Sequence, residues 1–407
     1  MQKRFTPDEG GVFPEWEEVT LGKIAEFSRG KGLTKKDVAE NGKKKCLLYG
    51  QLQVKYGTII KNVTGMTDAE IKNPVLSKAG DVLISGTISA GLAKASCIKE
   101  DGVIIGGDIN ILRPKEGIDG EFLARVINAN TKKFKRFLEG SVILHLKNEN
   151  IKEISIKIPK SIEEQRKIAV ALAAYDEMIA VKTAKLEVWQ ECKKRMVKEI
   201  FGRTKRFMDD DGKEFPEWEE KTLGKVTEYV RNGYSYKPDG VRTHKYKVTR
   251  IETISTGKIN PEKLGSCEEC DEKYLLKFGD ILYSNINSLS YLGNTAIYKN
   301  SSEKIYHGMN LLCIRPKSND IDADYLFAFL NSETARKFVK YNAQRAVNQC
   351  SIKVSDVRNM RIPLPCMEEQ QKIGSFLAEI DKEIQVQKEF IKTYAEGKKR
   401  MMWELVE

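Results

Sequence analysis

The residues that could perform catalysis are few and scattered along the chain. The Gly30-Lys-Gly-Leu-Thr stretch lacks the spacing of a phosphate-binding loop, and no Gly-x-Gly-x-x-Gly motif follows a predicted strand. We therefore expect no nucleotide or S-adenosylmethionine site in this chain. The three histidines, His145, His244 and His307, lie outside any metalloprotease-type motif. These patterns favour a protein without catalysis of its own, but they leave open an acidic nuclease site, whose residues scatter in sequence.

Two cysteines, Cys267 and Cys270, have the spacing of a metal-ligand pair. No second pair accompanies them and the first half of the chain has no equivalent, so we predict no metal site. The N-terminal segment is polar and does not resemble a signal peptide, and the sequence has no apolar run of about 18 residues. These features and the eight scattered cysteines indicate a cytoplasmic protein with free thiols.

Side chains that bind nucleic acid are by contrast abundant. The formal net charge is +11 and the pI is about 9.0, which favours an anionic partner, although many soluble proteins are mildly basic. Arginine, asparagine and glutamine read base edges, while lysine contacts phosphate, and both kinds cluster in three places in each half. For any one of them, a solvated surface position is the ordinary explanation.

The candidate DNA-binding residues fall into an early stretch, a loop after a Gly-Asp strand, and a segment before a long helix. In the first half they are Arg29, Lys31, Lys35, Lys36, Gln51, Gln53, Lys55 and Lys61; Ser85, Thr87 and Ser89; and His145, Lys147, Asn148 and Asn150. In the second half they are Arg231, Asn232, Tyr234, Tyr236, Arg242, His244, Lys245, Lys247 and Arg250; Asn285, Asn287, Ser288 and Asn294; and Arg345, Asn348, Gln349 and Lys353.

The elements that position these residues occur twice. FPEWEEVTLGKIAEF at 13–27 returns as FPEWEEKTLGKVTEY at 215–229, and KAGDVLIS at 78–85 returns as KFGDILYS at 277–284. NILRP at 110–114 is matched to NLLCIRP at 310–316, IDGEFLARVINANT at 118–131 to IDADYLFAFLNSET at 321–334, and EEQRKI at 163–168 to EEQQKI at 368–373. The order is preserved, so the chain is a tandem duplication. Residues 28–77 and 230–276 hardly match, which suggests related tasks with different specificities, although loops also diverge faster than cores.

Each half closes on a long predicted helix. From Glu163 to Phe201 there is neither proline nor glycine, and Ser161 with the following acidic residues is typical of a helix start. Apolar positions recur at alternating spacings of four and three, as in a coiled coil. The predicted seam positions are Ile168, Leu172, Tyr175, Ile179, Leu186, Trp189, Met196 and Ile200 in the first helix, and Ile373, Leu377, Ile380, Ile384, Ile391, Tyr394, Met401 and Leu405 in the second. Polar residues interrupt both seams, at Lys182 and Lys193 and at Gln387 and Lys398.

We expect the two helices, each about 58 Å long at about 1.5 Å per residue, to pair antiparallel through these seams. The alternative is that each helix packs on its own module. Antiparallel pairing predicts modules at opposite ends of the pair and neighbouring N- and C-termini.

The predicted fold is therefore α+β, with two duplicated modules related by a pseudo-twofold axis. Residues 82–85, 103–105, 281–284 and 310–314 are predicted strands, and residues 122–127 and 325–330 are predicted helices. The expected divisions are a module at 1–158, a spacer helix at 159–203, a second module at 204–363 and a second spacer helix at 364–407.

This doubled set of motifs resembles the specificity subunit of type I restriction–modification systems. The resemblance rests on Pro14–Gly22 and Pro216–Gly224, on Gly80–Leu83 and Gly279–Leu282, and on Ile158–Ile168 and Ile362–Ile373, and it covers essentially the whole chain. The second copy departs from the pattern in its longer Ile-Pro-Leu-Pro-Cys-Met approach to the helix, which leaves the helix start and register open.

The resemblance implies two target recognition domains, each reading one half of a split asymmetric DNA site, with the helices setting the gap. It also implies partners: double-stranded DNA, two methyltransferase subunits that carry S-adenosylmethionine and modify adenine, and restriction subunits that use ATP and Mg²⁺. A stand-alone nuclease and a coiled-coil adaptor without a DNA role are the rival interpretations.

Overall fold

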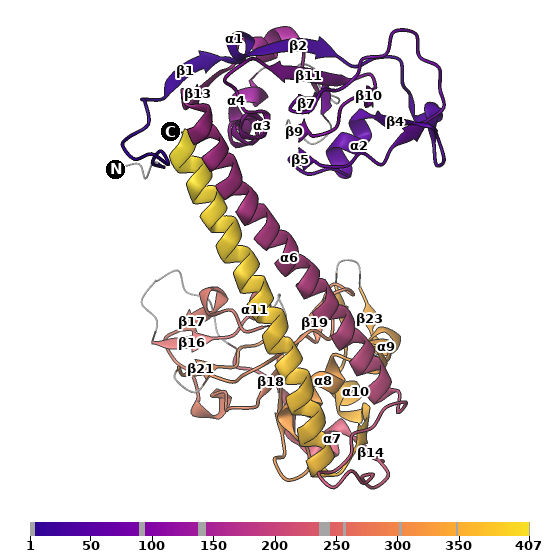
Figure 1. Ribbon diagram of the computed structural model, residues 1–407. Coiled ribbons are helices and arrows are strands. Elements are labelled where there is room, and N and C mark those ends of the chain that lie inside the picture. Colours follow the sequence, from indigo (N-terminus) through magenta and orange to yellow (C-terminus); the bar gives the residue numbers. More distant parts are fainter. Residues whose placement is uncertain are drawn as a thin grey trace. The chain divides into compact units, whose positions relative to one another are not determined.

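The computed structural model describes residues 5–88, 94–136, 144–235, 245–254, 258–300, 303–346 and 349–406. The chain divides into two compact units, Met1–Lys182 with Phe390–Glu407, and Thr183–Glu389. Each unit holds one module of mixed sheet and helix, a part of α6 (Ile162–Phe201) and a part of α11 (Met367–Val406), as Figure 1 shows. The predicted α+β class and the duplication are confirmed.

The module of the first unit is built on a five-stranded sheet in the order β2-β11-β7-β9-β5. Its strands are β2 (Ala25–Arg29), β11 (Ile109–Pro114), β7 (Val82–Ser85), β9 (Ala95–Ile98) and β5 (Ile59–Ile60). A second sheet runs β10 (Ile104–Ile105), β4 (Lys44–Leu47), β6 (Met66–Thr67) and β3 (Val38–Ala39), and β1 (Glu17–Thr20) pairs with β13 (Ser155–Ile158). The helices are α1 (Leu21–Ile24), η1 (Lys35–Asp37), α2 (Tyr49–Val54), α3 (Gly120–Ala129), α4 (Thr131–Lys135) and α5 (Asn148–Lys152).

The module of the second unit repeats the main sheet in the order β15-β22-β18-β20. These strands are β15 (Thr227–Asn232), β22 (Leu312–Pro316), β18 (Ile281–Tyr283) and β20 (Thr295–Ile297). A second sheet runs β17 (Gly265–Cys267), β16 (Tyr246–Val248) and β21 (Ile305–Tyr306), and β14 (Glu219–Thr222) pairs with β25 (Arg361–Leu364). The helices are α7 (Leu223–Val226), η2 (Ile251–Ile254), η3 (Pro261–Lys263), η4 (Glu272–Tyr274), α8 (Ala323–Leu330), α9 (Glu333–Asn342) and α10 (Val354–Asn359).

Strand register corrects one detail of the sequence alignment. Pro114 lies opposite Ala25 in β2, and Pro316 lies opposite Thr227 in β15, so the two prolines are equivalent. Counting back from them, Asn310 corresponds to Asp108 rather than to Asn110. Both residues have a positive φ, 60° and 73°, which Asp and Asn tolerate better than most side chains. The predicted strand at 310–314 accordingly begins later, at Leu312.

The long helices pair antiparallel within the first unit. Tyr175 of α6 meets Tyr394 of α11 with ring centroids 6.3 Å apart, and the Lys182 ammonium lies 4.5 Å from the Phe390 ring centroid. The Lys398 ammonium donates to Asp176. As the residue number rises in one helix, the partner's number falls, so the predicted direction is confirmed.

The same pairing is present in the second unit, where the Lys193 Nζ lies 2.6 and 2.7 Å from the two carboxylate oxygens of Asp381. Near the helix ends the seam also enters the module cores. Ile168 and Leu172 join the core of the first module, and Met196 and Ile200 join that of the second. Each helix therefore packs both on its partner helix and on a module, so each of the two predicted alternatives is partly confirmed. The Leu405 side chain lies outside the described residues.

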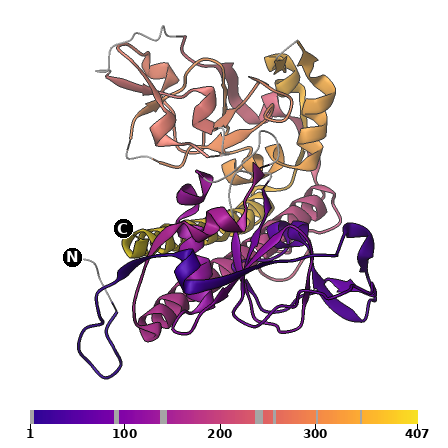
Figure 2. The ribbon, with the colours of Figure 1, turned by 90° about the horizontal axis from the view of Figure 1, so that it is seen from above.

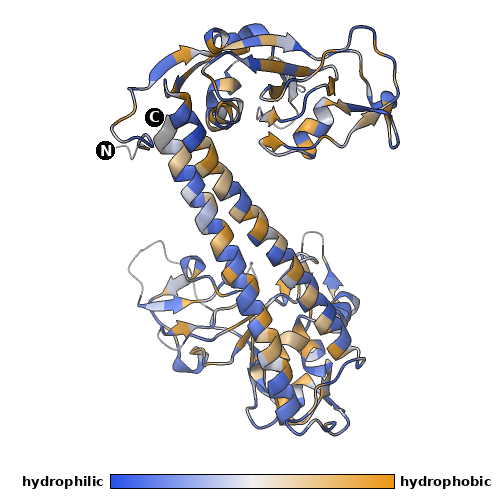
Figure 3. Cartoon of the chain, viewed as in Figure 1, coloured by the Kyte–Doolittle hydropathy of each residue, from blue (hydrophilic) through white to orange (hydrophobic). Residues whose placement is uncertain are grey.

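The two ends of the chain belong to one unit (Figures 1 and 2). Phe5, Met401 and Met402 pack against the same hydrophobic core, as the antiparallel arrangement predicts. Figure 3 shows hydrophobic residues recurring between hydrophilic ones along both long helices. Among the described residues, none of the helices is long and apolar enough to cross a membrane.

Candidate nucleic-acid interface

Three predicted segments of the first half meet at one edge of its main sheet. β8 (Thr87–Ile88) follows β7 and pairs with β12 (Leu144–His145), which places Thr87 opposite His145. The Asn148 side-chain amide donates to the Ser28 carbonyl at 3.0 Å, next to the end of β2. The loop after the Gly-Asp strand, the segment before the long helix and the end of β2 therefore form one surface.

Some residues that are predicted to contact DNA at this edge make hydrogen bonds within the protein. The Gln53 Nε2 donates to the Thr87 carbonyl at 2.7 Å and to the Ser85 hydroxyl at 3.2 Å. Ser85 is buried, and its hydroxyl donates to the same Thr87 carbonyl at 2.6 Å. The Gln51 side chain accepts from the Leu48 amide. We infer that Gln51, Gln53 and Ser85 support the surface through these internal bonds, and their predicted contact with DNA stays a prediction.

Arg29 ends β2 on the exposed side of this edge. Its guanidinium lies 2.6 Å from the Asp108 carboxylate, and both side chains are about half exposed, at 52% and 44%. An exposed pair of this kind contributes little to stability. The arginine can therefore exchange its carboxylate for a base edge or a phosphate at small cost.

The predicted phosphate contacts of the first half are exposed lysines. They are Lys31, Lys35, Lys36 and Lys55, with Lys147 beside the β12 segment. Lys31 lies near β10, since its backbone amide donates to the Ile105 carbonyl, and Lys35 and Lys36 form η1.

The second half brings the equivalent segments together by the same strand pairing. β19 (Ile286–Asn287) pairs with β24 (Cys350–Ser351), which pairs with β23 (Gln344–Arg345), so Asn287 and Arg345 both lie opposite Cys350. Arg345, Ser288 and Gln349 are exposed. The Asn285 side chain is buried, and its carbonyl oxygen has no hydrogen-bond partner among the described residues.

Arg231 is the counterpart of Arg29, but its surroundings differ. Its guanidinium carbon lies 4.0 Å from the Tyr229 ring centroid and 5.3 Å from that of Tyr274, and the guanidinium donates to the Lys273 carbonyl. Tyr234 extends this aromatic group, with its ring centroid 5.5 Å from that of Tyr274. Asn310 stands where the first half has Asp108. The same backbone position thus carries a charge-paired arginine in one module and an aromatic-packed arginine in the other.

Several other predicted residues of the second half lie at the end of β15, at or after the start of β16, or outside the described residues. Lys245 and Lys247 are at the start of β16, where the Lys247 ammonium pairs with Glu303, and Arg250 lies 3.7 Å from Glu252. Asn232 is exposed at the end of β15. Ser89, Tyr236, Arg242, His244 and Asn348 lie outside the described residues.

Sequence reasoning missed how the Glu-Glu-Gln motif ties each module to its helix. The Gln165 Oε1 accepts from the Asp119 amide at 2.9 Å, and its Nε2 donates to the carbonyls of Gly117 and Pro159 at 3.1 and 2.9 Å. Gln370 repeats this with Asp322, Asp320 and Pro365 at 2.9, 3.4 and 2.9 Å. We call each set of three bonds a glutamine clamp.

The second glutamate of the motif binds the tryptophan of the entry segment. The indole Nε1 of Trp16 donates to Glu164 at 3.1 Å, and that of Trp218 donates to Glu369 at 2.8 Å. The exact repetition of Glu-Glu-Gln and of Pro-x-Trp was the available signal. The sequence predicts a repeated helix start from these acidic residues, but it does not predict their bond to the tryptophan.

Chains with this fold have been solved before. A type I restriction–modification S subunit from M. genitalium matches with a TM-score of 0.67 and 16% sequence identity, over 97% of this chain and 96% of that chain. At this identity the likeness shows the fold. It defines a class of two-module proteins whose modules are joined by long helices.

The sequence comparisons define the family. A family model described as the type I restriction modification DNA specificity domain matches residues 14–188 and again 216–393, and the chain therefore belongs to this family, with two copies of the domain. Two relatives come from Methanocaldococcus jannaschii. The putative type I restriction enzyme MjaX specificity subunit is 40% identical over 210 residues, 50% of this chain and 49% of that protein. The type I restriction enzyme MjaVIII specificity subunit is 25% identical over 424 residues, 98% of this chain and 94% of that protein.

Proposed function

We propose that this chain is the DNA sequence-specificity subunit of a type I restriction–modification complex. Each module reads one half of a bipartite asymmetric DNA site, and the paired helices set the spacing between the half-sites. The helices also dock the methyltransferase subunits and, through them, the restriction subunits.

The observation that supports this most is the contrast between two equivalent edges. Strand pairing joins the same segments in both modules, yet Arg29 at the end of β2 is paired with Asp108, whereas its counterpart Arg231 in β15 is packed on Tyr229 and Tyr274. The two guanidinium groups therefore have different neighbours at equivalent positions, a carboxylate in one module and two tyrosine rings in the other. The same strand arrangement thus carries a different set of side chains in each module, which supports the reading of two different half-sites.

Catalysis in this proposal belongs to the partners. Methyltransferase subunits would carry S-adenosylmethionine, and restriction subunits would use ATP and Mg²⁺. Among the described residues, no group of three His, Cys, Asp or Glu side chains is arranged to hold a metal ion. The net charge of +11 would attract the DNA phosphates, and we place the complex in the cytoplasm.

The test is to map methylated adenines in cells that carry this chain and its methyltransferase partner. We expect methylation in one motif made of two different short sequences separated by a fixed gap. A single continuous motif, or a palindrome, would contradict reading by two modules.

Two assays on the purified chain separate the rival interpretations. Plasmid DNA incubated with the chain and Mg²⁺ should stay intact, and cleavage would favour a nuclease. Affinity for a duplex with the mapped motif should fall at least tenfold between about 50 and 200 mM salt, because phosphate contacts release counterions. Salt-independent or undetectable binding would favour an adaptor without a DNA role.

A further inference from the structure

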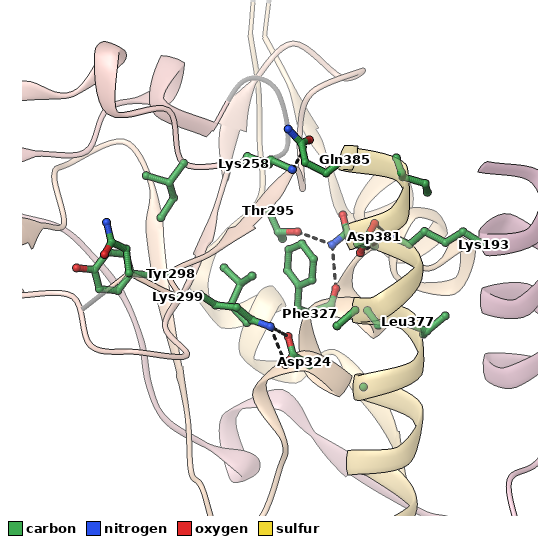
Figure 4. A pocket seen from close by; sticks show the side chains of 18 of the residues that line it. Lys193, Lys258, Thr295, Tyr298, Lys299, Asp324, Phe327, Leu377, Asp381 and Gln385 are labelled. Carbon is green, nitrogen blue, oxygen red and sulfur yellow. Dashed lines mark hydrogen bonds and ion pairs between the residues drawn. The ribbon is translucent and has the colours of Figure 1, made fainter. Parts of the chain in front are cut away.

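The second unit contains a cavity of about 680 Å³ between α11, α8 and β20. Figure 4 shows Asp381 and Leu377 of α11 on one wall, Phe327 of α8 on another, and Lys193 of α6 reaching Asp381. Ala328 also lines it. All of these residues belong to the second unit.

The first module shows which side chain can occupy the position equivalent to Ala328. In the repeat IDGEFLAR and IDADYLFA, Arg125 corresponds to Ala328. The Arg125 side chain is only 3% exposed, and its Nη1 donates to the Asp176 carboxylate at 2.6 Å. Module one therefore supplies a buried guanidinium where module two has a methyl group and an open space.

The carboxylate that receives this guanidinium is present in both units. Asp381 corresponds to Asp176, and Lys193 corresponds to Lys398 in the repeated KKRM segment. In the first unit, Lys398 binds Oδ1 of Asp176 and Arg125 binds Oδ2. In the second unit, the Lys193 ammonium lies between both oxygens of Asp381, whose side chain is 39% exposed, and no arginine of the described residues pairs with it. A carboxylate has about four acceptor positions, so Asp381 can accept a guanidinium as well.

The electrostatics of the first unit show how favourable this arrangement is. Burial alone raises the pKa of Asp176, but the hydrogen bonds from Lys398 and Arg125 outweigh burial and hold that pKa below its usual value. The carboxylate is therefore ionised, and two cations share it.

The far end of the cavity favours an arginine that is part of a polypeptide. One helical turn beyond Asp381, the Lys258 ammonium donates to Gln385. Burial, and then the charge of Lys388, lower the pKa of Lys258. These two amines can donate to the backbone carbonyls of an incoming chain, so this end of the cavity suits the amide groups that flank an arginine side chain. Glu303 and the Lys299–Asp324 ion pair line the remaining wall.

We propose that this cavity binds an arginine side chain of a partner protein. The guanidinium would donate to Asp381 and lie against the Phe327 ring, the flat contact that arginine commonly makes with aromatic faces. The second module would thus take from a partner the group that the first module supplies from its own sequence.

The first experiment needs no partner and does not depend on the proposed function. Binding of N-acetyl-arginine methylamide to the full chain is measured by saturation-transfer difference NMR, with the neutral isostere N-acetyl-citrulline methylamide as the control ligand. We expect saturable binding of the arginine probe, and binding of the citrulline probe weaker by about tenfold, the loss of one charge-assisted bond. Equal binding of the two probes, or binding of inorganic phosphate instead, would overturn the proposal.

Variants of residues that line the cavity test whether the probe binds there. Ala328→Arg should fill the space as Arg125 does and abolish probe binding, and Asp381→Asn should weaken it about tenfold. Arg125→Ala is the matched control in the other unit, and it should open a second site for the probe. Probe binding unchanged in both Ala328→Arg and Asp381→Asn would contradict the assignment, and melting temperatures check that each variant is folded.

The second experiment tests the partner and rests on the proposed function. The full chain is titrated with each purified subunit of the proposed complex, with and without Ala328→Arg. We expect affinity for one subunit to fall at least tenfold. Unchanged affinity for all of them, with the arginine probe still binding the wild-type chain, would overturn the partner role and leave the proposed DNA function untouched.

Discussion

The glutamine clamp yields the most detailed prediction. Gln165 and Gln370 are 0% and 1% exposed, and each makes two hydrogen bonds to the backbone before or at the start of α3 or α8 and a third to the proline carbonyl before its own long helix. Gln165→Leu keeps most of the side-chain volume and removes all three bonds. At roughly 1 kcal/mol for each lost bond, we expect the free energy of unfolding of the first unit to fall by about 3 kcal/mol.

Urea unfolding with hydrogen exchange as a local readout measures this loss. With a urea dependence of about 2 kcal/mol per molar, the unfolding midpoint of the first unit should fall by about 1.5 M. Exchange should rise at the Asp119 amide and in the first turn of α3, while α8 in the other unit keeps its protection. In Gln370→Leu we expect the converse, with faster hydrogen exchange in α8 and unchanged exchange in α3.

Gln371→Leu provides the matched control for Gln370→Leu, because Gln371 is exposed beside Gln370 on α11 and lies in the same unit. Its effect should stay within about 0.5 kcal/mol. A midpoint change below about 0.3 M for Gln165→Leu, or equal losses for Gln370→Leu and Gln371→Leu, would refute the claim that the clamp holds the module on its helix.

Three further predictions concern pH, the helix seam and the spacing. Burial lowers the pKa of His307 to about 4. As the pH falls below about 6.5, the His307 imidazole is therefore protonated in the unfolded chain before it is protonated in the folded chain. Between pH 7 and 4, the free energy of unfolding of the wild-type chain should fall by about 3 kcal/mol more than that of His307→Gln. Equal pH dependence in urea unfolding would contradict this. Gln387 is 2% exposed in the seam, and its Oε1 has no partner among the described residues. Gln387→Leu should therefore raise stability by about 1 kcal/mol, and a lower melting temperature would show that the amide stabilises the pair. Lengthening α6 and α11 by one heptad each, about 10.5 Å, should widen the gap in the methylated motif by about three base pairs, and an unchanged gap would exclude the spacing role.

Much of the architecture could be predicted because it repeats. The duplicated Gly-Asp strands, the helices at 122–127 and 325–330 and the two long helices all occur where periodicity placed them. Duplication alone did not fix the antiparallel direction, because a twofold axis can relate parallel or antiparallel helices; the contacts of Tyr175 with Tyr394 and of Lys182 with Phe390 show it in the first unit. The start of the second long helix, which was open, is Met367, the position equivalent to Ile162.

The interface was predicted less completely, because exposure depends on contacts between distant segments. Gln53 belongs to a divergent, polar stretch, yet its amide is used by the loop after β7. Asp108 was not singled out, although the left-handed turn there places its carboxylate beside Arg29. Arg125 looked like an ordinary helix residue, and only its contact with Asp176, far along the chain, reveals the difference between the two modules.

The central claim is that each module reads its own half of the DNA site. Exchanging residues 1–158 for the first module of another family member and mapping methylated adenines in cells tests it most directly. We predict that one half of the motif changes while the other half and the gap stay the same. A change in both halves, or in neither, would contradict reading by independent modules.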